Sequence, residues 1–145
     1  MILAPCTLAH LDAIRPAIPV TAWPVLSLYL TRGPALAGIL DDGAVLGAGG
    51  IAVAYRGVGD AWLVTSQLAR TQPMLYARTI RRILAVLTET LEIRRLQAVV
   101  DARLQVNIQF LEWLGFTQEG LMRAAGFQGQ DLFLYSRVRS GHERV

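Results

Sequence analysis

The segment of this sequence best suited to chemistry is a short strand, a polar loop and a long helix between residues 61 and 91. Apolar residues at 61–64 predict the strand, and the polar run 65–72 predicts the loop. Pro73 suits the first position of a helix, because the N–H group that proline lacks would have no partner there. The free N–H groups of a first helical turn carry a partial positive charge that attracts phosphate. The sequence therefore predicts a phosphate site, and with it a cofactor, at the start of this helix.

Other residues offer less chemistry. Cys6 is the only cysteine, so no disulfide forms within the chain, and we expect a reducing compartment such as the cytoplasm. A single cysteine is a candidate nucleophile, although a small buried side chain is its more common role. The basic residues are all arginines, which excludes Schiff-base chemistry on lysine. The glycines at 47, 49 and 50 resemble a dinucleotide-binding loop, but they lead into a strand-like segment and so predict a bulge or a close approach of strands. The sequence predicts no metal site.

The composition is that of one domain with a large core. The chain has 145 residues, 53% of them hydrophobic, and a mean hydropathy of +0.39. The longest uncharged run, 16–31, is too short to span a bilayer and contains Pro19 and Pro24. No basic residue precedes the apolar start, so neither a membrane segment nor a secretory signal is expected. The net charge of +3 comes from arginines spread along the chain, and we therefore do not expect nucleic-acid binding.

Apolar periodicity predicts the elements that position the strand, loop and helix. Before them we expect a strand at 2–4, a helix at 8–14 with Thr7 as its N-cap, a helix at 23–30, strands at 35–40 and 44–55 joined by an Asp-Asp-Gly turn, a turn at 56–60 and a strand at 61–65. After the helix at 73–91 we expect a buried strand at 96–100, a largely buried helix at 104–114 ending at Gly115, and closing strands at 116–122 and 132–138. The strand at 96–100 follows a helix directly and should have a parallel partner. The domain thus spans 1–139, with a disordered tail at 140–145.

The order of these elements, β-α-α-β-β-β-α-β-α-β-β, resembles the GNAT (GCN5-related N-acetyltransferase) family. The similarity covers nearly the whole chain and is strongest at 107–137. There Phe-Leu-Glu-Trp-Leu-Gly-Phe-Thr-Gln-Glu-Gly (110–120) and Gln-Asp-Leu-Phe-Leu-Tyr-Ser-Arg-Val (130–138) are similar to the family's C-terminal half. The resemblance implies an α/β (α+β) single domain, with a mixed, mostly antiparallel sheet of about six or seven strands, four flanking helices and a splayed central parallel pair.

The resemblance also implies a mechanism. The splayed strands are 61–65 and 96–100, and acetyl-CoA (or another acyl-CoA) lies between them like an added strand. Leu63, Val64 and Thr65 offer backbone groups to its pantetheine arm, the pyrophosphate lies at the start of the helix at Pro73, and an amine attacks the thioester directly. This reaction needs a base for the ammonium proton, donors for the developing oxyanion and an acid for the leaving thiolate.

The sequence departs from the family pattern at the phosphate loop, which in the family reads Gln/Arg-x-x-Gly-x-Gly/Ala. Gln67 matches, but Arg70 and Gln72 replace both glycines, and their side chains obstruct the approach of the backbone to phosphate. Arg70 is either a direct partner of the phosphate or a solvated loop residue. On the last helix, the family's usual tyrosine acid falls on Leu111, which cannot donate a proton. Asn107, one turn earlier, is expected either to hold a water or the cofactor arm, or to make a polar contact at the edge of strand and helix.

Two residues are candidates for catalysis. Asp101, at the end of the second splayed strand, is the first choice for the base, against the plainer role of a helix-capping or surface carboxylate. Tyr135, on a closing strand, is the reserve proton donor, against the plainer role of a core tyrosine. The expected function is N-acyl transfer from acetyl-CoA to an amine, a small molecule or protein that the sequence does not identify.

The alternative function is a catalytically inactive, GNAT-like binding or virion-associated protein. The degenerate phosphate loop and the compact C-terminal half are most similar to short GNAT-like proteins of phages and prophages. A homodimer formed through the closing strands is also expected for so apolar a chain.

Overall fold

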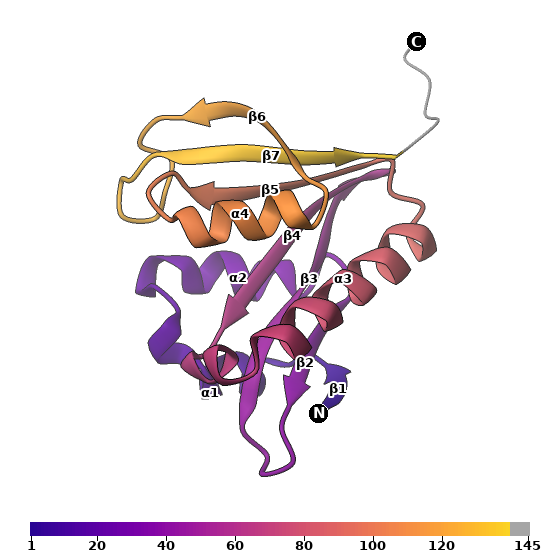
Figure 1. Cartoon of the computed structure of the whole chain (residues 1–145), viewed down its shortest axis with the longest axis vertical. Helices are drawn as coiled ribbons and strands as arrows, with labels where there is room; N and C mark the ends of the chain where they lie inside the picture. Colours follow the sequence, from indigo (N-terminus) through magenta and orange to yellow (C-terminus); the bar gives the residue numbers. More distant parts are fainter. Residues whose placement is uncertain (140–145) are drawn as a thin grey trace.

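The computed structural model describes residues 1–139, which fold around one seven-stranded sheet with helices on both faces (Figure 1). The strands are β1 (Ile2–Pro5), β2 (Ala35–Ile39), β3 (Val45–Tyr55), β4 (Val58–Thr65), β5 (Arg95–Asp101), β6 (Thr117–Met122) and β7 (Leu132–Val138). The helices are α1 (Leu8–Ala13), α2 (Trp23–Tyr29), α3 (Pro73–Thr90) and α4 (Gln105–Trp113), with short 3₁₀ helices η1 (Arg15–Ala17), η2 (Val20–Ala22) and η3 (Gln67–Thr71). The predicted tail, 140–145, lies outside the described residues.

The sheet has the order β1-β2-β3-β4-β5-β7-β6. Every neighbouring pair is antiparallel except β4 and β5, which run parallel and are connected through α3. The predicted fold class, a mixed and mostly antiparallel sheet with one central parallel pair and four helices, is confirmed. No helix in this part of the chain is both long enough and apolar enough to cross a membrane.

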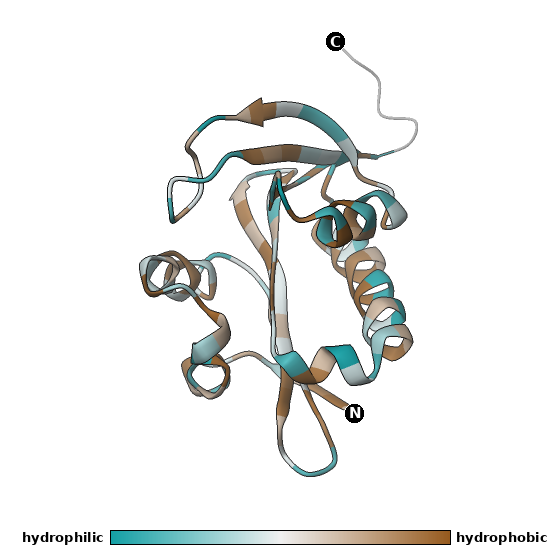
Figure 2. Cartoon of the chain, turned by 60° about the vertical axis from the view of Figure 1, so that its left-hand side comes forward, coloured by the Kyte–Doolittle hydropathy of each residue, from teal (hydrophilic) through white to brown (hydrophobic). Residues whose placement is uncertain are grey.

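The core consists of two hydrophobic clusters, one on each face of the sheet (Figure 2). On one face α1 and α2 contribute Leu11 and Leu26, which pack with Trp62 of β4. On the other face α3 and α4 contribute Leu84 and Ile108, which pack with residues of β5 and β7. The helix pairs therefore bury opposite faces of the same strands, and β4 and β5 lie at the centre of the sheet with a helical layer on either side.

Local signals in the sequence set several element ends. Thr7 caps α1 in a reciprocal arrangement with His10, which confirms the predicted N-cap. Gly115 ends α4 with φ of +93°, a conformation that glycine adopts without strain. A Cβ atom at Gly49 would lie 2.6 Å from the Trp62 carbonyl oxygen, so the glycines of β3 permit a close approach of strands, as predicted.

Two predictions about elements are wrong. The run 56–60 is not a five-residue turn, because the turn consists of Arg56 and Gly57 alone, with φ of +83° at Gly57, and β4 already begins at Val58. Asp60 is therefore a strand residue. The helix α4 is not largely buried: Ile108 is its only buried residue, and Val106 is 77% exposed. A helix in an outer layer buries one face alone, so apolar residues around its circumference do not make it an interior helix.

Candidate active site

The neighbouring strands β4 and β5 separate part-way along their length. They pair at only three positions, Val58 with Arg95, Gly59 with Leu96 and Asp60 with Gln97. Beyond these positions β4 remains paired to β3, and β5 remains paired to β7. Each strand therefore keeps its outer ladder and leaves its inner edge without a strand partner (Figure 1). The predicted splay between 61–65 and 96–100 is confirmed, although Leu96 and Gln97 still belong to the paired part.

Exposed apolar side chains flank the gap on both faces of the sheet. Leu63 of β4 is 43% exposed and Val99 of β5 is 53% exposed, although both strands lie in the interior of the sheet. Leu63 alternates with Trp62, which packs under α1 and α2, so Leu63 faces α3 and α4. Val99 alternates with Ala98 and Val100, which pack under α3 and α4, so it faces the α2 side. The gap is thus accessible from both sides.

The unpaired edge of β4 carries the residues predicted to bind the cofactor arm. Leu63, Val64 and Thr65 pair with Gly49, Ala48 and Gly47 of β3 on one side. In an antiparallel ladder only alternate residues bond to a given neighbour, so the remaining N–H and C=O groups point into the gap. An extended ligand can add to this edge by main-chain hydrogen bonds.

The start of α3 lies beyond the end of β4 and is open to an anion. Gln72 is the N-cap residue, its side chain makes no capping hydrogen bond, and the first turn holds no acidic residue. The first-turn N–H groups therefore keep their unsatisfied partial positive charge. The phosphate site at Pro73 stays a prediction, and the free N–H groups at the start of α3 are where it would lie.

The preceding loop differs from an open phosphate cradle, because it is wound into η3. The N–H groups of Ala69 and Gln72 donate to carbonyl oxygens within this turn, which leaves fewer of them for a ligand. The Arg70 side chain is exposed and takes part in no ion pair within residues 1–139. Its guanidinium is therefore available to an anion.

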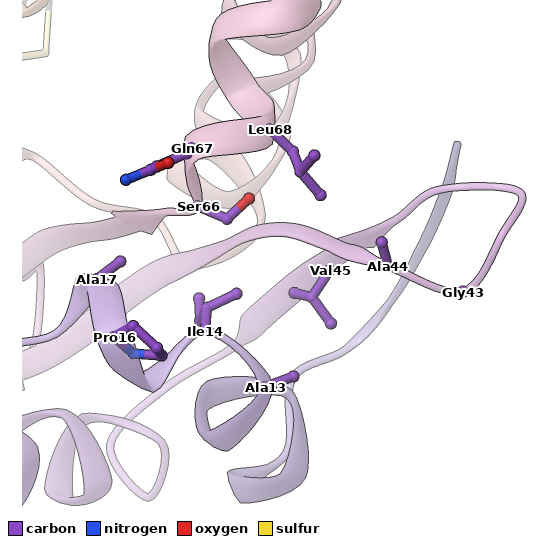
Figure 3. A pocket seen from close by; sticks show the side chains of 10 residues that line it. All are labelled: Ala13, Ile14, Pro16, Ala17, Gly43, Ala44, Val45, Ser66, Gln67 and Leu68. Atoms are coloured by element: carbon purple, nitrogen blue, oxygen red, sulfur yellow. The ribbon is translucent and has the colours of Figure 1, made fainter.

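Gln67 lies on the other side of this loop. Together with Ser66 and Leu68 it lines a surface pocket of about 350 Å³. The end of α1 with its C-cap Ile14, the helix η1, and the turn leading into β3 at Val45 form the opposite wall (Figure 3). The lining is mostly apolar, and the Ser66 hydroxyl donates to the Leu46 carbonyl oxygen at 2.9 Å. Gln67 thus borders a pocket that lies between the loop before α3 and residues 13–17.

Asp101, the predicted base, is held in an ion pair. Its carboxylate accepts hydrogen bonds from Arg103, from the backbone N–H at 2.9 Å, from Nε at 3.0 Å and from Nη2 at 2.8 Å. These bonds lower the pKa of Asp101 to about 2. A carboxylate so strongly stabilised in its ionised form accepts a proton poorly, so the structure disfavours Asp101 as the base.

Tyr135 and Asn107 lie in contrasting surroundings. Tyr135 is 1% exposed, belongs to the cluster under α3 and α4, and its hydroxyl lies 3.4 Å from the Gln118 side-chain oxygen. Burial, and secondly the charge of Glu112, raise its pKa. Tyr135 therefore occupies the position of a core tyrosine. Asn107 is exposed in the first turn of α4, which starts just past the end of β5.

Asp60 is a candidate site residue that the sequence reasoning missed. It lies on β4 at the last position paired with β5, where the gap begins, and its carboxylate accepts a hydrogen bond of 2.8 Å from Gln97 Nε2. It shares a face of β4 with Trp62. Within a Gly-rich run, Asp60 resembled a turn residue. The sequence did contain a signal for a strand: Asp60, Trp62 and Val64 are spaced two residues apart, which places their side chains on one face of a strand.

Comparison with solved structures supports the architecture. No protein-family model and no curated protein matches the sequence. Among solved structures, the chain is similar to an IAA acetyltransferase from Bacillus cereus (8% identity, 95% of this chain and 99% of that one, TM-score 0.77). It is also similar to a GNAT superfamily phosphinothricin acetyltransferase from Sinorhizobium meliloti in complex with AcCoA (21% identity, 99% and 92%, TM-score 0.70). A third is a spermidine/spermine N-acetyltransferase from Vibrio cholerae (16% identity, 94% and 91%, TM-score 0.71). The chain has the GNAT fold.

In this GNAT fold an aromatic stack joins α3 to α4 beside the gap. The ring of Tyr76 stacks on Phe110 with centroids 6.1 Å apart, Phe110 stacks on Trp113 at 6.0 Å, and Arg81 lies 4.7 Å from the Trp113 ring centre. Burial raises the pKa of Tyr76, and the adjacent Thr65 hydroxyl offsets part of this. Tyr76 therefore places a protonated hydroxyl near the end of β4, on the face to which Leu63 points.

Cys6 is the remaining candidate from the sequence. Its side chain is half-buried and packs against the cluster under α1 and α2. Burial raises the pKa of its thiol to about 11. A thiol with so high a pKa holds little thiolate at neutral pH, so the position suits a structural cysteine and not a nucleophile.

Proposed function

We propose that the protein is an acetyl-CoA-dependent N-acyltransferase that transfers an acetyl group to an amine by direct attack. The observation that carries this proposal is the divergence of β4 from β5 after three paired positions within a GNAT fold. Similar solved structures bear the names of acetyltransferases, and one of them is a complex with AcCoA.

The residues of the gap fit an acyl-CoA. The backbone of Leu63, Val64 and Thr65 would bond the pantetheine arm along the free edge of β4. The start of α3 and the guanidinium of Arg70 would hold the pyrophosphate. Asn107 and the hydroxyl of Tyr76 are the polar side chains that we assign to the flanks of the arm.

We assign the role of general base to Asp60. When bound, acetyl-CoA supplies the thioester carbon that the neutral amine nitrogen attacks. Asp60 takes the proton that the amine must lose, either directly or through one water. Backbone N–H groups of the β4 edge donate to the developing oxyanion. As the carbonyl re-forms, the carbon–sulfur bond would break and the sulfur would leave as a thiolate, which would take a proton from water, while Asp60 would return the amine proton to solvent. Asp60 is preferred to Asp101 because it sits where the strands separate and is not held by an arginine.

Calorimetric titration with acetyl-CoA tests this function. We expect saturable binding, and thiol release when an amine acceptor is added. Absence of heat at millimolar acetyl-CoA would defeat the proposal. The variant for comparison is Arg70→Gln, which removes the exposed guanidinium that would hold the pyrophosphate. This variant should bind acetyl-CoA more weakly than wild type.

A second candidate is a GNAT-shaped binding protein without acyl transfer. It is favoured by the loop before α3, where Arg70 and Gln72 stand in place of two glycines and η3 occupies the turn. This candidate predicts a stable protein partner and no thiol release with any amine. Co-purification from the native source, together with the titration above, separates the two candidates.

A further inference from the structure

A chain of hydrogen bonds crosses four strands of the sheet and ends on Asp60. Gln97 Nε2 donates to Asp60 Oδ1 at 2.8 Å, and Gln97 Oε1 accepts from Arg95 Nε at 3.1 Å. The other two nitrogens of Arg95 donate to Glu119, Nη1 to Oε2 at 2.9 Å and Nη2 to Oε1 at 2.6 Å. Ser136 Oγ donates to Glu119 Oε2 at 2.6 Å. The chain therefore links β4, β5, β7 and β6, from the start of the gap to the edge of the sheet.

The geometry of the sheet brings these side chains together. Asp60 pairs with Gln97 across β4 and β5, and Gln97 pairs with Ser136 across β5 and β7, so the three residues form one row on one face of the sheet. Glu119 has no paired residue in β7, because the register shifts at its position. A bulge of this kind re-aims a side chain, and the Glu119 carboxylate reaches Ser136, which is 4% exposed.

The neighbours of Gln97 permit only one orientation of its side-chain amide. A guanidinium has only donors, and an ionised carboxylate has only acceptors. Oε1 must therefore face Arg95, and Nε2 must face Asp60. The two parallel hydrogen bonds to Glu119 hold the Arg95 guanidinium in place. The amide of Gln97 cannot turn over without leaving both of its partners unsatisfied.

This arrangement occupies one oxygen of the Asp60 carboxylate. Gln97 binds Oδ1, whereas within residues 1–139 Asp60 Oδ2 takes part in no hydrogen bond and no ion pair. The bond to Oδ1 limits the rotation of the carboxylate, and it does so at the position where β4 and β5 separate. A base must lie within hydrogen-bond reach of the proton that it takes, so the direction of Oδ2 matters to the reaction.

We propose that Gln97 is a positioning residue for acyl transfer, which holds Asp60 Oδ1, with its own amide fixed by Arg95 and Glu119, so that Oδ2 takes the proton of the amine. The inference rests on the proposed function, in which Asp60 is the base. The proton moves from the amine nitrogen to Oδ2 as the bond from nitrogen to the thioester carbon forms, and Asp60 afterwards returns it to solvent.

NMR tests the contact without any acyl transfer. Asp60→Asn replaces the charged acceptor of the Gln97 amide by a neutral one, so the nitrogen and proton chemical shifts of that amide should move. The comparison is the side-chain amide of Gln118, which lies beside Tyr135 on the opposite face of the sheet and should keep its shifts. Unchanged shifts of the Gln97 amide overturn the inference.

A double-mutant cycle tests the role in the reaction. Gln97→Met keeps the length of the side chain and removes both hydrogen bonds. On its own it should lower kcat about tenfold or more, toward the roughly 100-fold that a displacement of about 1 Å costs. In the Asp60→Asn background it should change kcat by less than about twofold, because the group that it positions is absent. Gln97→Asn, whose amide is one methylene shorter and cannot reach both partners, replaces Gln97→Met if that variant does not fold.

Thiol release from acetyl-CoA would be measured with methionine, spermidine and phenethylamine, an amino acid, a polyamine and an aromatic amine. The matched control is Gln118→Met, which should leave kcat unchanged, and Gln97→Met should leave the affinity for acetyl-CoA within about twofold of wild type. Wild-type kcat in Gln97→Met, or equal losses of kcat in both backgrounds, overturns the inference while the acyl transfer stands. If the wild type releases no thiol with any of the three amines, the proposed function fails and the role of Gln97 falls with it.

Discussion

Asp60→Asn is the substitution that most directly tests the assignment of the base. It removes a carboxylate and changes the shape of the side chain very little. The amide oxygen of asparagine still accepts the hydrogen bond from Gln97 Nε2, which is 2.8 Å long in the wild-type protein. Because that bond joins β4 to β5 at their last paired position, the variant should fold like the wild type. It loses only the capacity to take a proton from the amine.

The size of the expected effect follows from this single loss. General-base catalysis contributes about 10²–10⁴-fold to a rate, so kcat should fall by about that factor. Acetyl-CoA would be held by the backbone of β4 and by the start of α3, and the substitution changes neither. The dissociation constant for acetyl-CoA should therefore stay within about twofold of the wild-type value. A tenfold change would correspond to a loss of about 1.4 kcal/mol in binding free energy. The assay is thiol release with a chromogenic disulfide, with affinity measured by calorimetry. Cys6 adds little background, because its thiol pKa is about 11.

Two matched carboxylate variants serve as comparisons. Asp12→Asn changes an exposed residue of α1 that is paired with Arg15 and should leave kcat unchanged. Asp101→Asn removes the carboxylate that Arg103 holds ionised, and it should lose far less activity than Asp60→Asn. If Asp60→Asn retains wild-type kcat, or if Asp101→Asn is the more damaging change, the assignment of the base to Asp60 is refuted.

Three further predictions concern stability and reactivity. Hydrogen bonds from Arg95 and then Ser136 lower the pKa of Glu119 from 4.5 to about 2. The stabilisation from this carboxylate is therefore complete above pH 4.5 and is lost as the pH falls toward 2, so the urea midpoint should drop across that range and Glu119→Gln should flatten the drop. Leu96→Ala, at a fully buried position of β5, should lower the free energy of unfolding by about 2–5 kcal/mol in urea titrations. Alkylation of Cys6 at neutral pH should be slow in the folded protein and fast after denaturation, and equal rates would contradict its raised thiol pKa.

The elements that could be predicted are those set by local chemistry. Thr7 and Gly115 end their helices through their own side chain or backbone conformation, and Asp-Asp-Gly marks the hairpin between β2 and β3, where Gly43 has φ of +87°. The start of β4 at Val58 could not be read in this way, because its strand conformation depends on pairing with Tyr55 and Arg95. How much of α4 is buried likewise depends on whether the helix lies in an outer or an inner layer of the fold. The positions of its apolar residues do not indicate which layer it joins.

The same division applies to the site. Asp101 and Arg103 are two residues apart, so their ion pair could have been anticipated from the sequence. Asp60 and its partner Gln97 are 37 residues apart, and nothing near Asp60 in the chain indicates that contact. The separation of β4 from β5 was inferred from the resemblance to the GNAT family, since the apolar pattern of each strand is the same whether its inner edge is paired or free.

The gap between β4 and β5 lowers the stability of the fold little. This explains how the gap is retained in a sequence that shares so little identity with the sequences of similar structures. Each strand keeps a full antiparallel ladder on its outer edge, to β3 or to β7, and the groups on the inner edges remain accessible to water. An acyl-CoA arm would replace water along an edge that is already extended, so its binding depends on backbone groups that any residue supplies. Side chains would matter at the two ends of the arm, where we propose that the start of α3 and Arg70 bind the phosphates and Asp60 binds the amine. Arg70 would therefore offset part of the affinity that the loss of the two loop glycines costs, while the proposed chemistry at the other end of the gap would depend on Asp60.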